Sequence, residues 1–243
     1  MVYEKSFLQH FRDADADGLI GAKGYFGFMT DLASEQLHFE GKGNVTLPEK
    51  YGAAWIYTKC RLQDCIPIGF EEEVHAECRI SRVDKARLWQ DMKVEYKGRP
   101  VCRGRLESCI YHLGEKKLKP VKFIELSESL KEEADSEIDH FSRPASSTEG
   151  MEKVYEYKAA YSDLDKNGHM TNQRYLPMFL NAAGRDAFDG RFLKDLELHF
   201  IGQTYYNETL SVYSKAADSA LELLALKENG SIAAWCRMDL CII

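Results

Sequence analysis

The chain has 243 residues, of which 44% are hydrophobic and 29% charged, values typical of a globular protein with one large or two small domains. Its formal net charge of -7 argues against nucleic-acid binding, because phosphate contacts require a clustered positive field. No apolar run reaches the ~18 to 20 residues of a membrane span, and neither a signal peptide nor a CxxC pair accompanies the cysteines. We therefore expect a cytoplasmic protein with reduced, mostly buried thiols that binds neither nucleic acid nor membranes.

The first half of the chain predicts one helix between a single strand and a longer run of strands. Residues 2–11 form the first strand candidate, and a polar turn and a helical segment follow. Four β-rich stretches come next, with Lys97 and Gly98 marking a hairpin between the last two. These stretches are AAWIYTKCRL, EEEVHAECRIS, LWQDMKVEY and VCRGRLESCIYH.

Residues 127–150 are charged at first and then rich in Ser, Pro and Gly, which is typical of a linker. The charged part predicts an exposed helix capped by Ser127 or Ser129. The second half then repeats the order of the first: a strand at 152–160, a polar turn, a helix and several strands, with a hairpin at Asn229 and Gly230. We therefore predict two domains, 1–126 and 151–243.

The two halves also repeat one another in sequence. A shift of 150 residues aligns 13–35 with 163–185 without a gap, and a shift of 132 aligns 96–110 with 228–242. The identities are Asp13/Asp163, Asp15/Asp165, Gly18/Gly168, Tyr25/Tyr175 and Ala33/Ala183 in the first window, and Gly98/Gly230, Arg105/Arg237, Cys109/Cys241 and Ile110/Ile242 in the second. Two windows in the same order indicate a duplication. The pattern predicts the α+β class, with two antiparallel sheets that each wrap a helix.

The segment SDLDKNGHMTNQRYL, which starts at Ser162, has three possible interpretations. It begins like a calcium-binding loop, but position 12, where such loops carry a bidentate Glu, is Arg174 here and Gly24 in the first copy. Its acidic residues could instead cap a helix, which is the preferred interpretation of Asp163. The third interpretation is a catalytic turn.

The catalytic interpretation rests on Asp165, Asn167 and His169. Residues at i, i+2 and i+4 of an extended segment point to one side, so a carboxylate, an amide and an imidazole would gather beside a helix N-terminus. The backbone N–H groups of residues 171–175 could polarise a carbonyl there, and the carboxylate could activate water or attack directly. Pro177 predicts a kink or a late helix start near Arg174. No metal or other cofactor is required, since a lone His is a poor zinc site.

At these residues the sequence resembles the SDLDxNxHxNNxxY signature of the acyl-[acyl carrier protein] thioesterases, which have tandem hotdog domains. The resemblance implies an N-terminal hotdog at 1–126 that binds the acyl chain and a catalytic C-terminal hotdog at 151–243. It also implies that Asp165, Asn167 and His169 are the catalytic residues. Gln203 departs from the family, because it falls where the family has an acidic residue on the following strand. We expect Gln203 to position water while Asp165 acts as base or nucleophile.

The resemblance further implies one active site per chain, because Leu19 and Asp17 replace His169 and Asn167 in the first repeat. Further substrate-binding candidates are Thr171, Asn172, Tyr175, Phe28, Met29 and Trp55; core packing explains the last three equally well. The expected partner is acyl carrier protein bearing an acyl-phosphopantetheine. Basic residues that could dock this acidic partner are Arg99, Arg103, Arg105, Lys116, Lys117, Lys119 and Lys122, although each could equally lie on a solvated surface.

Several alternatives stay open from the sequence. An acyl-CoA thioesterase of the same fold is one, and a non-enzymatic calcium- or lipid-binding protein is another. A Cys-His-Asn triad is disfavoured because every cysteine lies in a strand-like or buried context. The sequence leaves the acyl chain length and a homodimeric state undecided.

Overall fold

The computed structural model describes residues 2–126, 136–217 and 219–242, and the predicted helix at Ser127 or Ser129 lies outside these residues. The chain divides into two compact units, Met1–His140 and Phe141–Ile243. Within the described residues, no helix has both the length and the apolar character needed to cross a membrane.

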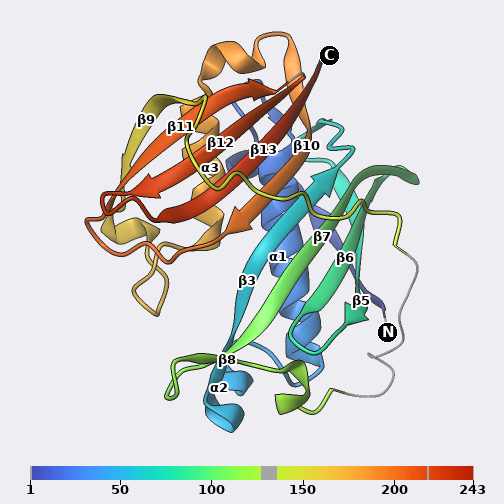
Figure 1. Cartoon of the computed structure of the whole chain (residues 1–243). Coiled ribbons are helices and arrows are strands. Elements are labelled where there is room, and N and C mark those ends of the chain that lie inside the picture. The colour runs from blue at the N-terminus through green and yellow to red at the C-terminus, as the bar shows by residue number, and fades with distance from the viewer. Residues whose placement is uncertain (1, 127–135, 218, 243) are drawn as a thin grey trace. The chain divides into compact units, whose positions relative to one another are not determined.

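The first unit consists of one antiparallel sheet with a long helix against one face (Figure 1). The strand order is β1-β5-β6-β7-β3, with β8 paired to β7, and β2 and β4 form a separate two-stranded ladder. The elements are β1 (Val2–Leu8), η1 (Phe11–Asp13), β2 (Leu19–Ile20), α1 (Ala22–Phe39), α2 (Thr46–Tyr51), β3 (Ala53–Gln63), β4 (Ile68–Gly69), β5 (Glu73–Val83), β6 (Leu88–Tyr96), β7 (Arg99–His112), β8 (Lys117–Lys119) and η2 (Val121–Phe123).

Helix α1 is held against the sheet by large apolar side chains and by one glycine of the sheet. Tyr25, Met29 and Leu32 are almost fully buried on the helix. On β7, a Cβ atom added at Gly104 would lie 2.8 Å from the Met29 sulfur, so the strand approaches the helix more closely than a larger residue would allow. The core of this unit therefore lies between α1 and the sheet.

The second unit has the same plan on a smaller scale. Its antiparallel sheet has the order β10-β13-β12-β11-β9, and α3 buries Tyr175, Leu176, Met178 and Phe179. The Tyr175 ring lies 5.6 Å from that of Phe200, which places α3 on the Phe200 face of β10. The elements are β9 (Glu152–Lys158), η4 (Tyr161–Asp163), α3 (Asn172–Ala183), η5 (Arg185–Phe188), β10 (Arg191–Phe200), β11 (Thr209–Ala217), β12 (Ala220–Lys227) and β13 (Ile232–Ile242).

The two units share one topology, as the internal repeat predicts. Strands β1, β3, β5, β6 and β7 occupy the same places in their sheet as β9, β10, β11, β12 and β13 in theirs. The equivalence extends to single hydrogen bonds. Asp15 donates its N–H to the Leu19 carbonyl at 2.8 Å, and Asp165 donates to the His169 carbonyl at the same distance.

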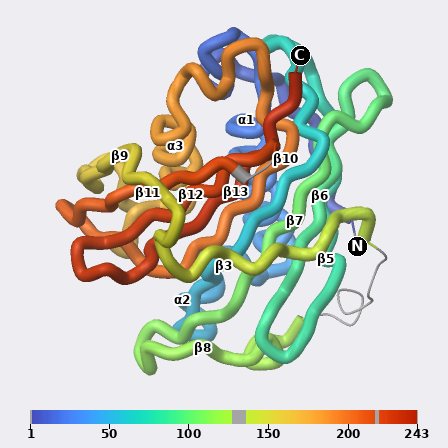
Figure 2. Tube along the Cα trace, turned by 45° about the horizontal axis from the view of Figure 1, so that its top comes forward, coloured from blue at the N-terminus to red at the C-terminus, as the bar shows by residue number. Residues whose placement is uncertain are grey.

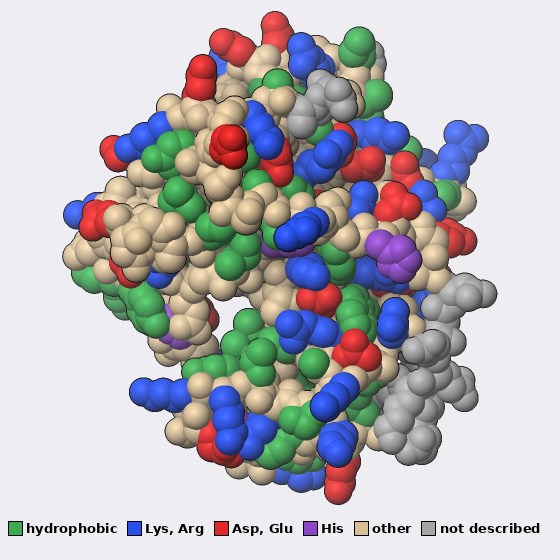
Figure 3. All heavy atoms as spheres, viewed as in Figure 1, with side chains coloured by type: hydrophobic (Ala, Val, Ile, Leu, Met, Phe, Trp, Pro, Cys, Tyr) green, Lys and Arg blue, Asp and Glu red, His purple; other side chains and the backbone are tan. Residues whose placement is uncertain are grey.

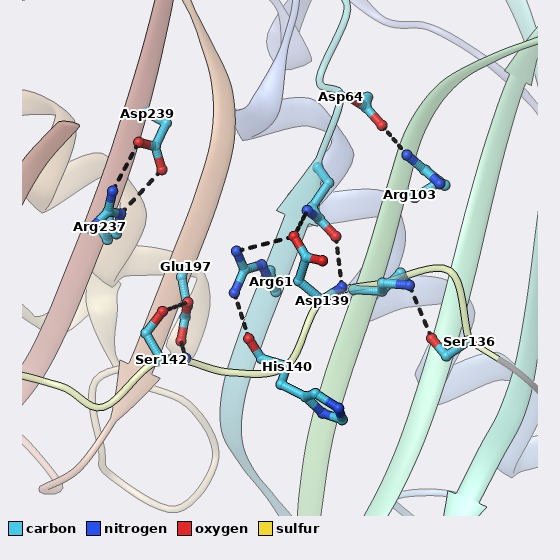
Figure 4. Close-up of polar contacts among 12 residues, drawn as sticks. Arg61, Asp64, Arg103, Ser136, Asp139, His140, Ser142, Glu197, Arg237 and Asp239 are labelled. Carbon is cyan, nitrogen blue, oxygen red and sulfur yellow. Dashed lines mark hydrogen bonds and ion pairs between the residues drawn. The ribbon is translucent and has the colours of Figure 1, made fainter. Parts of the chain in front are cut away.

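Polar contacts fix the chain on both sides of the unit boundary (Figure 4). In the first unit, residues 136–140 cross the face of the sheet opposite α1 (Figure 2), where Gln63 donates to the Asp139 carboxylate at 2.6 Å and Arg61 to the His140 carbonyl at 2.7 Å. In the second unit, the Ser142 hydroxyl donates to Glu197 at 2.9 Å. This part of the predicted linker is therefore anchored by hydrogen bonds, which compensate for its few apolar residues.

Candidate active site

The turn that leads into the signature segment is built around Asp163. This residue is 5% exposed, and its carboxylate accepts hydrogen bonds at 2.8 Å from the Tyr157 hydroxyl and from the Ala160 N–H. The Arg174 guanidinium lies 3.4 Å from its other oxygen. Burial, together with the bond to Asp163, raises the pKa of Tyr157 to about 12. Asp163 therefore stabilises the turn, as predicted, and its carboxylate is paired with protein donors.

Asp165 lies in the next turn, and its carboxylate folds over that turn. One carboxylate oxygen accepts the backbone N–H groups of Asn167 at 2.8 Å and His169 at 3.2 Å, and the other accepts the Asn167 side-chain amide at 3.2 Å. Gly168 closes the turn with a φ of 77°, a left-handed conformation that suits glycine. The three predicted catalytic residues are thus brought together. The predicted reason is wrong, because a tight turn rather than an extended segment gathers them.

A loop between β10 and β11 forms the second part of the site. His169 makes an isolated antiparallel bridge with Tyr205, and the His169 and Tyr205 rings meet edge to face with their centroids 4.9 Å apart. The Tyr205 hydroxyl donates to the Gln203 side-chain oxygen at 3.1 Å. Tyr205 therefore contacts both His169 and Gln203. Gln203 belongs to the loop that follows β10, so its predicted place on a strand is wrong.

Two buried residues hold this loop against the helix. The Tyr175 hydroxyl donates to Thr204 Oγ1 at 3.0 Å, and the Met170 N–H donates to the Thr204 carbonyl at 2.8 Å. Tyr175 is 2% exposed and Thr204 is 0% exposed, and burial raises the pKa of Tyr175. Tyr175 was predicted to bind substrate. Its burial and its bond to Thr204 show that it supports the loop, and a role in substrate binding stays a prediction.

The N-terminus of α3 supplies fewer backbone donors than the sequence suggests. The helix begins at Asn172, so the late start near Arg174 is wrong, and Pro177 lies within the helix. Thr171 precedes the helix with extended backbone and makes no side-chain capping bond. Its N–H is donated to the Asp163 carbonyl at 2.8 Å, and the Arg174 N–H is donated to the Thr171 carbonyl at 2.9 Å. These two N–H groups are used within the turn and are not available to a substrate.

The three apolar residues predicted to contact an acyl chain lie in the first unit and differ in burial. Phe28 and Met29 are 7% and 1% exposed, and the Phe28 ring stacks on Phe7 at 5.2 Å. Both belong to the core. Trp55 is half-buried beside a cluster of buried apolar residues and donates its indole N–H to the Lys42 carbonyl at 2.8 Å. A role in acyl binding stays a prediction for all three.

The predicted carrier-docking residues do not form one patch. Arg105 is 9% exposed and makes a two-pronged ion pair with Asp91 at 2.7 and 2.8 Å, while Arg103 pairs with Asp64 and Glu137. Figure 3 shows positive and negative side chains interspersed over the viewed face of this unit. Arg105 is therefore excluded as a docking residue, and Arg103 is already paired on both sides.

The remaining basic residues separate into two groups. Arg99 begins β7, whereas Lys116, Lys117, Lys119 and Lys122 follow its end, about 43 Å away for a strand of this length. Lys117 and Lys119 lie 2.5 and 2.6 Å from Glu115, and these two cations lower the pKa of Glu115 to about 2. Arg99, Lys116 and Lys122 are exposed.

Sequence analysis did not single out a buried pair on the opposite face of the second sheet. Glu197 and His199 are 3% and 2% exposed and lie 2.7 Å apart, and Glu197 also accepts the Ser142 N–H at 2.7 Å. Because residues alternate along β10, this pair points away from the face where Phe200 meets α3. It anchors the segment at Ser142 and is separate from the Asp165 turn. Its two-residue spacing within a strand was the available signal.

Cysteine and metal chemistry receive no support from the described residues. Six cysteines are buried, and burial raises the pKa of the Cys78, Cys109 and Cys236 thiols, which disfavours thiolates. Across residues 2–126, 136–217 and 219–242, no three His, Cys, Asp or Glu side chains are grouped so as to hold a metal ion.

The comparison with protein families points to the same part of the chain. Residues 146–234 match the family model of the acyl-ACP thioesterase C-terminal domain, and this range includes both the Asp165 turn and the Gln203 loop. This part of the chain is similar to the C-terminal domain of the acyl-ACP thioesterases. Acyl-ACP thioesterases are thioester hydrolases, and the match supports this class of reaction for the protein. No curated protein sequence matches this chain at a significant level.

Solved structures share the fold over the whole length of this chain. The acyl-ACP thioesterase from Bacteroides thetaiotaomicron superposes with a TM-score of 0.87 at 17% identity, covering 99% of this chain and 98% of that one. The 12:0-ACP thioesterase from Umbellularia californica superposes with a TM-score of 0.82 at 14% identity, covering 100% and 98% of the two chains. At these identities the likeness establishes the fold alone.

Proposed function

We propose that the protein hydrolyses fatty acyl-acyl carrier protein to a free fatty acid and the carrier protein. Each unit would be a hotdog domain, the first binding the acyl chain and the second catalysing the reaction. The observation that carries the proposal is the cluster of Asp165, Asn167 and His169 in one turn, inside the segment that matches the family's C-terminal domain. Asp17 and Leu19 occupy the equivalent places in the first repeat, which supports one active site per chain.

The proposed reaction begins with the attack of water on the thioester carbonyl carbon. Asp165 is exposed, and its second carboxylate oxygen accepts only the Asn167 amide among the described residues, so a lone pair is left to accept a water proton. The carbon–sulfur bond then breaks, and the proton that Asp165 took from water passes to the departing thiolate, with His169 placed to relay it. Direct attack by Asp165, with later hydrolysis of the mixed anhydride, uses the same geometry.

The hydrogen bonds of the turn give Asn167 and the backbone a defined role. By holding the carboxylate from two backbone N–H groups and one amide, they fix its direction before substrate arrives. The N-terminal end of α3 lies three residues after His169 and contributes a positive dipole near the developing oxyanion. His169→Ala should lower kcat by about one to three orders of magnitude. An unchanged rate would assign His169 a structural role instead.

The carrier distinguishes this function from its nearest alternative, an acyl-CoA thioesterase. The test compares kcat/KM for the same acyl chain on acyl carrier protein and on coenzyme A. We expect the carrier-protein thioester to be the better substrate, and a clear preference for the coenzyme A thioester would contradict the proposal. Exposed Lys116 and Lys122, which follow the end of β7, are the proposed docking residues, and exposed Arg99 at the start of that strand is a separate candidate. Calcium titration by calorimetry, with no heat of specific binding expected, tests the non-enzymatic alternative.

A further inference from the structure

Tyr205, which was not predicted as a site residue, contacts two of the predicted catalytic residues. Its ring meets that of His169 edge to face at 4.9 Å, and its hydroxyl donates to Gln203 at 3.1 Å. It is 46% exposed, so these contacts are not a consequence of burial in the core. One side chain thus connects the imidazole to the amide that replaces the family's acidic residue.

The ion pair between Glu208 and Lys227 holds Tyr205 in place. The Tyr205 N–H donates to a Glu208 carboxylate oxygen at 2.9 Å, and the Lys227 ammonium lies 3.0 Å from the same oxygen. Lys227 also lies 5.4 Å from the centre of the Tyr205 ring. Partial burial alone would raise the pKa of Glu208, but the Tyr205 N–H and Lys227 together lower it. The backbone and the ring of Tyr205 are both held.

The repeat offers an internal comparison for this residue. In the first unit Leu19 pairs with Gly69 where the second unit pairs His169 with Tyr205. One backbone hydrogen bond and one backbone angle also match between the two loops. The Gln9 N–H donates to the Glu72 carbonyl and the Ala159 N–H to the Glu208 carbonyl, both at 3.0 Å. The preceding residues, Glu71 and Asn207, have φ values of 64° and 63°. This loop forms with glycine at the tyrosine position, so its backbone does not require Tyr205.

We propose that Tyr205 is a positioning residue for the hydrolysis described above, and this inference rests on that proposed function. Its ring sets the orientation of the His169 imidazole for proton transfer. Its hydroxyl occupies the Gln203 side-chain oxygen, so that the Gln203 amide presents its N–H groups to the attacking water or to the thioester oxygen. The tyrosine therefore turns Gln203 into a hydrogen-bond donor in the one repeat that carries the histidine.

Two substitutions separate the roles of the hydroxyl and the ring. Tyr205→Phe removes only the bond to Gln203, and we expect kcat to fall about fivefold to tenfold with little change in KM. Because both changes act on one contact, Tyr205→Phe should add little to the effect of Gln203→Leu in the double variant. Additive losses in the double variant would overturn the role assigned to the hydroxyl.

Tyr205→Leu also removes the ring and should alter the pH dependence of kcat as well as its size, because His169 loses its partner. Tyr206→Leu is the matched control: its side chain is adjacent and 56% exposed, and its substitution should leave kcat and the pH profile unchanged. A Tyr205→Leu variant with the wild-type rate and pH profile would overturn the proposal. Equal effects at positions 205 and 206 would do the same.

NMR of the His169 ring provides a readout that does not depend on turnover. In the wild-type protein the His169 Cε1–H signal should be displaced by the Tyr205 ring, in Tyr205→Phe it should keep that displacement, and in Tyr205→Leu it should lose it. If the wild-type protein did not hydrolyse the carrier thioester, the proposed function would fail, and the positioning of His169 would still be decided by this signal. An identical signal in wild type and Tyr205→Leu would overturn the positioning role.

Discussion

Replacing Asp163 by alanine should destabilise the second unit by about 3 to 4 kcal/mol. The carboxylate of this buried residue accepts two hydrogen bonds of 2.8 Å, and bonds to a charged acceptor contribute about 1.5 to 3 kcal/mol each. The lower end applies because the Tyr157 hydroxyl is only partly buried. The Arg174 pair adds less than about 1 kcal/mol, since the Arg174 side chain is 45% exposed.

Asp165→Ala is the matched comparison for this prediction. The two aspartates lie two residues apart in the same segment, but Asp165 is exposed and its hydrogen bonds are confined to its own turn. We expect its removal to lower the free energy of unfolding by about 1 kcal/mol or less. Urea unfolding followed by circular dichroism measures both variants. A larger loss for Asp165→Ala than for Asp163→Ala would refute the assignment of a structural role to one and a chemical role to the other.

Three further outcomes follow from the described contacts. Asp91→Ala should destabilise the first unit by about 3 to 5 kcal/mol, because it leaves the Arg105 guanidinium buried without its partner, and urea unfolding would show it. The lowered pKa of Glu208 means that its stabilising contribution is present above pH 4.5 and is lost as pH falls through that lowered pKa, so the stability difference between wild type and Glu208→Gln should shrink in acid. Charge reversal at Arg99 or Lys122 should raise KM for the carrier-bound substrate, most strongly at low salt, without changing stability; an effect that ignores salt would argue against docking there.

The repeat made the fold accessible from the sequence. The shift of 150 residues that aligns Asp15 with Asp165 also relates the first residues of the two helices, Ala22 and Asn172. Gly18 and Gly168 have φ values of 80° and 77°, a backbone conformation that favours glycine. Identical residues at such turns made the alignment of the two repeats detectable in the sequence. The residues of the turns therefore indicated the duplication more clearly than those of the strands.

The rest of the site depends on contacts that a single sequence does not contain. Tyr205 reaches His169 across 36 positions of the chain, and nothing in the local sequence marks it, since Tyr206 beside it is equally aromatic. Arg105 was misassigned for a related reason. Arg105 stands in a run of basic residues, which suggests a strand exposed to solvent. In the structure its guanidinium pairs with Asp91, and the hydroxyl of the distant Ser136 donates to the same carboxylate. Local charge patterns do not reveal which face another segment crosses.

The most direct test of the central claim is the turnover of an acyl-acyl carrier protein thioester by Asp165→Asn and Asp15→Asn, which occupy equivalent places in the two repeats. Asp15 pairs with Lys23 at 3.2 Å, and Leu19 stands in its repeat where the second repeat has His169. Substitution of Asp15 should therefore leave kcat nearly unchanged. Asp165→Asn should lower kcat by about three orders of magnitude or more with the fold intact. Near-normal turnover by Asp165→Asn, or an equal loss in both variants, would contradict the assignment of the reaction to the second unit.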